Sequence, residues 1–187
     1  MSQFDYLCVP LSIIIGLAIT QILKGFRGLL LSRARLKLYW PSLVWALLLL
    51  AVCGQTWWAQ YGMRKIPSWT FLGFSVVELQ TVILYMLAAI VFPDFFDERG
   101  TDLRAHYFAH TRWFFSLFVA LILTSLLKEP VLGGHFGDSV NVGFHFFFIA
   151  LALVTIVFRR EWVHKAMSIV AVAVFVVYMM TLFTRLN

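Results

Sequence analysis

The chain has 187 residues, of which 61% are hydrophobic and 13% are charged, and its mean hydropathy is +0.87. A soluble domain is about 45–50% apolar and about 25% charged, so this composition excludes a water-soluble globule and indicates an integral membrane protein. The formal net charge is +6. Since the basic residues lie between apolar runs, where they set membrane topology, we predict no nucleic-acid partner.

Six apolar segments follow one another along the chain. A helix that crosses a membrane needs about 20 mostly apolar residues. In chain order the candidate spans are residues 5–24, 40–60, 69–92, 111–128, 140–158 and 162–184. The fourth and fifth spans are the shortest. We therefore predict an all-α integral membrane protein, a bundle of six transmembrane helices with short loops, as a single domain over residues 1–187.

The charge of the loops predicts the orientation of the bundle. Of the 15 Lys and Arg residues, all but Arg64, Lys65, Lys128 and Arg185 lie in or beside the first, third and fifth loops. By the positive-inside rule, these loops face the cytoplasm and both termini lie outside it. The membrane is then a plasma membrane or a bacterial inner membrane, and its anionic lipids are expected partners at the cytoplasmic face.

Glu78 lies near the middle of the third span, in a run that is otherwise almost entirely apolar. Helical geometry places Tyr85 nearly on a line with Glu78, and Ser75 and Thr81 flank this line. A carboxylate in hydrocarbon is costly and must face other helices or water. Three interpretations remain open: Glu78 titrates or binds a cation on a transport path, it bonds an amide, a hydroxyl or His145, or it binds a cofactor or substrate head group.

The region before the fourth span contains a possible metal site. Thr101 or Asp102 is expected to cap a helix that leads into this span. On that helix Asp102, His106 and His110 are spaced by four residues, and two histidines at this spacing can chelate a transition metal. The alternatives are a solvated helix face with an Asp102–His106 pair and a docking or pH-sensing surface. No cofactor is predicted, but haem or a transition metal stays as an alternative.

Polar residues from several spans fall at mid or outer depth once the orientation is applied. Gln55 lies in the second span, and Asn141 and His145 lie one helical turn apart in the fifth. With the third-span residues they predict a polar cavity that opens to the outside. Its predicted lining is Gln55, Ser75, Glu78, Tyr85, Asn141 and His145.

These features predict a small channel or transporter for an ion or a small solute, assembled as a homo-oligomer, with Glu78 at its centre. One alternative is a non-catalytic accessory subunit of a larger membrane complex. Another is a redox or lipid-modifying enzyme that binds haem or metal through His106, His110 or His145. Because the sequence has no Walker A loop, GxSxG or HExxH motif, a non-catalytic role is favoured.

Overall fold

The computed structural model of the protein describes residues 3–32, 36–94, 101–134 and 138–182. These residues form six long helices and one short 3-10 helix, η2: α1 (Gln3–Leu31), α2 (Trp40–Gln60), η2 (Tyr61–Lys65), α3 (Phe71–Ile90), α4 (Leu103–Gly133), α5 (Ser139–Val157) and α6 (Glu161–Leu182). Each of the six long helices is long and apolar enough to cross a membrane. The predicted six-helix membrane bundle is therefore confirmed, and the chain is an integral membrane protein.

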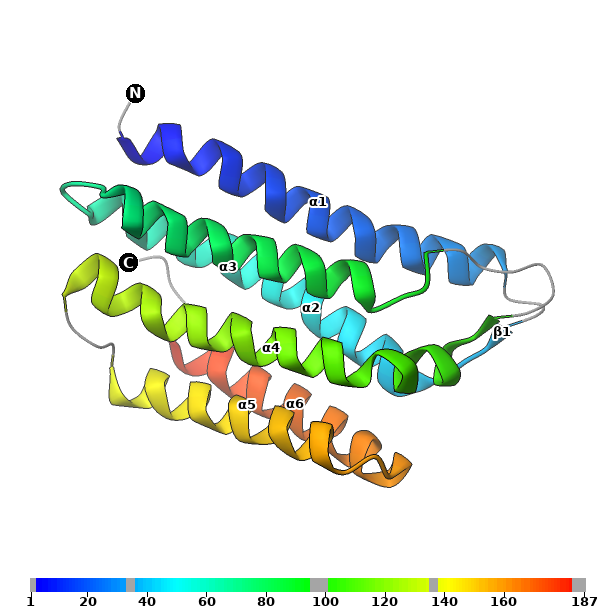
Figure 1. Ribbon diagram of the computed structural model, residues 1–187. Helices are drawn as coiled ribbons and strands as arrows, with labels where there is room; N and C mark the ends of the chain where they lie inside the picture. Colours follow the sequence, from blue (N-terminus) through cyan, green and yellow to red (C-terminus); the bar gives the residue numbers. More distant parts are fainter. Residues whose placement is uncertain (1–2, 33–35, 95–100, 135–137, 183–187) are drawn as a thin grey trace.

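The helices form two layers in the view of Figure 1. Helices α1, α3, α4 and α5 lie side by side in front, and α2 and α6 lie behind them. The start of α1 and the end of α6 are at the same end of the bundle, which we call the termini end. The opposite end, the strand end, carries a short parallel pairing of β1 (Leu36–Lys37) with β2 (Thr101–Asp102). This pairing joins the segment that precedes α2 to the segment that precedes α4.

Helix α4 ends later than the sequence predicted. The sequence predicted a helix capped at Thr101 or Asp102 that leads into a short span over 111–128, whereas the helix runs for 31 residues, Leu103–Gly133, and so continues past residue 128. At its start the Asp102 side chain accepts a hydrogen bond from the Ala105 N–H at 2.9 Å, which confirms the expected cap. At its end Gly134, with φ 71°, donates its N–H to the Pro130 carbonyl. Hydropathy detects only the apolar centre of such a helix, because its polar ends reach beyond the hydrocarbon.

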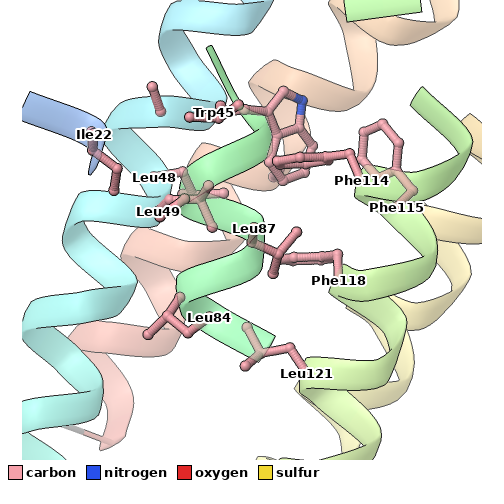
Figure 2. Packing of buried hydrophobic residues seen from close by; sticks show 14 of the residues in the cluster. Ile22, Trp45, Leu48, Leu49, Leu84, Leu87, Phe114, Phe115, Phe118 and Leu121 are labelled. Carbon is pink, nitrogen blue, oxygen red and sulfur yellow. The ribbon is translucent and has the colours of Figure 1, made fainter. Parts of the chain in front are cut away.

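An aromatic cluster fills the centre of the bundle. The Trp45 side chain is 1% exposed, and its ring meets those of Phe115 and Phe118 edge to face at centroid distances of 5.0 and 5.5 Å. Figure 2 shows these rings beside Leu84 and Leu87 of α3, both of which have no exposed surface. Edge-to-face aromatic contacts add about 0.5–1.5 kcal/mol per pair beyond burial. The cluster joins α2, α3 and α4 into a close-packed core.

Helix α1 closely approaches the segment just after α3 at Gly25. A β-carbon at this position would overlap the Phe92 side chain, whose own β-carbon would lie only 2.9 Å away. The Phe92 ring also meets the Phe26 ring edge to face at 5.2 Å. Gly25 is therefore needed for the close approach, whereas a β-carbon at Gly16 of the same helix would meet nothing within 4 Å.

We expect Gly25→Ala to destabilise the protein by about 1–3 kcal/mol, because the added methyl group must displace Phe92 from a filled interface. The matched control is Gly16→Ala, which should change stability by less than about 0.5 kcal/mol. Thermal unfolding of both variants in the same detergent measures the difference. Equal melting temperatures for the two variants would contradict the close contact.

Candidate functional site

A cavity of about 500 Å³ lies in the half of the bundle nearer the termini end. Its walls come from five of the six long helices, α2 to α6, and from η2. Pockets that hold small molecules are typically about 300–1,000 Å³ and are mostly apolar with a few polar groups. The cavity therefore has the size and position of a binding site for a small molecule within the membrane.

The deep wall of the cavity is apolar. It is lined by Leu48, Val52, Phe118, Ile122, Phe148 and Phe175. Phe118 belongs both to this wall and to the aromatic cluster, since its ring contacts Trp45. Toward the strand end the cavity is therefore closed by the packed rings of that cluster.

A hydrogen-bond network between α4 and α5 forms one polar wall. The Asn141 side-chain amide donates to Glu129 Oε1 at 2.8 Å. His145 Nδ1 lies 2.7 Å from the Asn141 carbonyl oxygen, and its Nε2 lies 3.1 Å from Ser125 Oγ. Because a carbonyl only accepts, Nδ1 carries the proton, and the neutral ring can accept the Ser125 hydroxyl proton at Nε2. The network orients His145 at the cavity wall.

Three other polar side chains reach the cavity without such partners. Gln55 of α2 and Gln80 of α3 both line it, and among the described residues neither side-chain amide makes a hydrogen bond. The Lys128 ammonium also lines it and has no ion pair or hydrogen bond within this part of the chain. These groups are free to bind a solute.

The structure brings together only half of the side chains that the sequence assigned to the cavity. Gln55, Asn141 and His145 line it, but Ser75, Glu78 and Tyr85 do not. Tyr85 instead accepts a hydrogen bond from Gln21 of α1 at 3.4 Å.

Glu78 differs most from the expectation, because it was placed at the centre of the cavity. It lies two residues before Gln80, so the two side chains project about 200° apart around α3. Gln80 faces the cavity, and the Glu78–Tyr85 line faces the side of α1. The partners of His145 are Asn141 and Ser125, so His145 is not the partner of Glu78. The cavity carboxylate belongs to Glu129.

Sequence reasoning missed most residues of the cavity, including the polar or charged side chains of Gln80, Lys128, Glu129 and Tyr178. Gln80 is an amide inside an apolar run, and the same argument that singled out Gln55 applies to it. Lys128 and Glu129 were placed at the end of a short span. They lie inside α4 because this helix continues to Gly133.

The predicted metal candidates do not converge. Asp102 caps α4 and lies 3.8 Å from the Lys37 ammonium. His106 Nε2 is 3.1 Å from the Ile90 carbonyl oxygen and His110 Nδ1 is 2.9 Å from the His106 carbonyl oxygen, so these two nitrogens donate protons. Only the other nitrogen of each ring is left as a possible ligand, and Asp102 does not join the two rings, whose centroids are 4.3 Å apart. Within the described ranges no group of three potential ligands is close enough to hold a metal ion.

The strand end is held by ion pairs and by a buried tyrosine–histidine contact. Glu161 of α6 accepts from Arg104 of α4 at 2.9 Å and from Lys165 at 2.8 Å. Tyr107 of α4 lies 3.0 Å from Nδ1 of His164, which has no exposed surface. These contacts tie α4 to α6 at the end opposite the cavity.

Two groups just outside the spans have shifted pKa values. Burial and the charge of Glu161 raise the pKa of Tyr39 to about 12, although the charge of Arg104 acts in the opposite direction. The Ala105 N–H, with smaller effects of Lys37 and Arg104, holds the pKa of Asp102 below its usual value. At neutral pH Tyr39 is therefore a neutral phenol. Asp102 is a carboxylate, as its roles as the N-cap of α4 and as the partner of Lys37 require.

Comparisons of the chain with protein-family models, with curated proteins and with solved structures each find no match. The fold and the cavity define the class of protein: a six-span membrane bundle with a small-molecule-sized cavity near one end.

We expect Asn141→Leu to lower the stability of the protein by about 1–3 kcal/mol, because it leaves the Glu129 carboxylate without its donor. Gln55→Leu is the matched control. It removes an amide that has no partner among the described residues, and should change stability by less than about 0.5 kcal/mol. Thermal unfolding in detergent compares the two variants. A destabilised Gln55→Leu beside a stable Asn141→Leu would contradict the assigned network.

Proposed function

We propose that the protein is a membrane carrier that binds a small amphipathic solute in the cavity and moves it across the bilayer. The observation that carries this proposal is the cavity itself, about 500 Å³ in volume, with an apolar deep wall and a polar wall built by α4 and α5. Such a lining suits a molecule with one polar end and one apolar end.

A carrier is favoured over a channel by the asymmetry of the bundle. The cavity occupies the termini half, whereas the core next to it is filled by Trp45, Phe115 and Leu49, each at most 1% exposed. Passage toward the strand end would require these helices to separate. Alternating access, in which helices move around a fixed binding site, is the usual solution for such an arrangement.

We infer that the strand end faces the cytoplasm and that the cavity belongs to the outer half of the membrane. The basic residues of the first, third and fifth loops support this orientation through the positive-inside rule. A smaller cavity of about 120 Å³ at the strand end is lined by Lys24 and Arg27 of α1 and by Phe92 and Asp94, which follow α3. Its two cations outnumber the one carboxylate and suit the phosphate of an anionic lipid in the cytoplasmic leaflet.

The contacts that would open in the inward-facing state lie at the strand end. Arg104 and Glu161 join α4 to α6, and the β1–β2 pairing joins the two loops beside them. Charged pairs that are partly exposed are weak and can exchange with water. These contacts can therefore stabilise the state in which the strand end is closed and still break when the protein changes to the inward-facing state.

We expect a cysteine at Ala59, which lines the cavity, to react with a membrane-impermeant maleimide from the termini side only. The background chain has Cys8→Ser and Cys53→Ala. Adding Glu161→Gln removes the ion pair and should raise labelling from the strand side about two- to fivefold, as one partly exposed ion pair allows. Labelling rates in vesicles of both orientations measure the change.

Asp94→Asn is the control, since it removes an exposed carboxylate at the same end that makes no ion pair among the described residues. It should leave both labelling rates unchanged. The result would count against a carrier if the Glu161→Gln chain is labelled from the strand side only at the background rate while its labelling from the termini side is unchanged.

A second candidate function is that of a subunit in a larger membrane assembly or a homo-oligomer. The observation that favours it is Glu78, whose half-buried carboxylate makes no hydrogen bond or ion pair within the described part of the chain. On neighbouring α1 the small residues Gly16 and Thr20 are exposed. An intramembrane carboxylate of this kind needs a partner, which another chain would supply.

If this second role holds, Glu78→Gln should reduce the fraction of protein in a high-mass assembly on native gels of mildly solubilised membranes. The melting temperature of the isolated chain should stay unchanged, because the Glu78 carboxylate has no partner within the described ranges. A wild-type chain that migrates as a monomer from its native membrane excludes the role.

A further inference from the structure

We propose that the cavity selects amphiphiles with an acidic head group, a carboxylate or a phosphate, and that Lys128 binds this group. The inference rests on the proposed function, because it names the chemical class of the solute. It starts from a cation that makes no direct ion pair among the described residues, although the charge of Glu129 acts on it from the same cavity.

Lys128 is half-buried on α4 and lines the cavity. No carboxylate lies within ion-pair distance of its ammonium in the described ranges, whereas Lys37, Arg104 and Lys165 each have one. A cation in an apolar surrounding is costly unless it is paired or reaches water. An anionic group bound in the cavity would supply the missing partner.

The neighbouring carboxylate does not fill this role. Glu129 directly follows Lys128 on the helix, so the two side chains project about 100° apart. Glu129 Oε1 instead accepts a hydrogen bond from the Asn141 amide at 2.8 Å. The carboxylate is therefore held by α5, and its charge acts on Lys128 only from beyond ion-pair distance. The ammonium keeps its direct contacts for a solute.

The rest of the cavity fits the remainder of such a molecule. Phe118, Phe148 and Phe175 provide an apolar wall on which a hydrocarbon chain can lie, removed from water. The free amides of Gln55 and Gln80 can donate to the oxygens of the head group. A single acyl chain with one acidic end matches both parts.

The test uses the full chain in an uncharged maltoside detergent. Stabilisation against heat is titrated with three ten-carbon probes: decanoate, decanol and decyltrimethylammonium. Decanoate should stabilise the wild type at a concentration about tenfold or more below that of decanol, as expected for a charge-assisted hydrogen bond. Decyltrimethylammonium should be the weakest of the three.

Lys128→Met should abolish the preference for decanoate and leave the effect of decanol unchanged. Lys65→Met is the matched control, because Lys65 is an exposed cation at the same end and does not line the cavity. It should behave as the wild type. Lys128→Arg keeps the charge and should keep the preference, which guards against a loss caused by misfolding.

The source of the head group is distinguished in bilayers. The protein is placed in phosphatidylcholine nanodiscs with radiolabelled decanoate, and lysophosphatidic acid is added to the bilayer. If lysophosphatidic acid displaces decanoate, the solute is a membrane lipid. Decanoate that lysophosphatidic acid fails to displace supports a carboxylate taken from water.

Two results would overturn the inference. If decanol and decanoate stabilise the wild type equally, the acidic head group is wrong, although the cavity still binds amphiphiles. If Glu129→Gln, and not Lys128→Met, changes the order of the probes, the selecting charge is the carboxylate. Failure of all three probes to stabilise the wild type would also remove the proposed binding function.

Discussion

The contact on which the rest of the structure depends is the one between the Trp45 ring and the rings of Phe115 and Phe118. It fills the centre of the bundle between α2 and α4, where a gap between helices would otherwise run along the molecule. Since Phe118 is also the floor of the cavity, this one cluster determines where the packed core ends and where the open space begins. The two halves of the protein differ because the rings around Trp45 pack against one another in one half, whereas Phe148 and Phe175 in the other half border an open space.

Polar groups inside the bilayer divide into two kinds. Most hydroxyls bond the backbone of their own helix: Ser75 donates to Phe71, Thr124 to Ala120 and Ser168 to His164, each at 2.6 to 2.8 Å. Such a bond satisfies the hydroxyl without any neighbour, so these residues carry little information about a site. Amides, imidazoles and charges are harder to satisfy within one helix, and six of them line the cavity: Gln55, Gln80, Lys128, Glu129, Asn141 and His145.

The two ends of the bundle differ in their contacts, and the proposed carrier function makes use of this asymmetry. The strand end is closed by partly exposed ion pairs and a two-residue strand pairing, which are weak enough to open. The termini half contains the open volume and the Lys128 ammonium, which makes no direct ion pair among the described residues. In the proposed carrier, a solute that pairs with this charge would couple binding to movement by favouring one state over the other.

The amino-acid sequence by itself determined that the chain spans a membrane six times, because about 20 apolar residues in a row have no other stable surrounding. It also identified Gln55, Asn141 and His145 as polar groups of one layer. It could not determine which face of each helix meets the cavity. Only the packing of α3 between α1 and α4 decided that Gln80 points inward and Glu78 toward the side of α1, since a rotation of the helix exchanges the two. The length of α4 was likewise decided by its caps and its packing, and these brought Lys128 and Glu129 into the site.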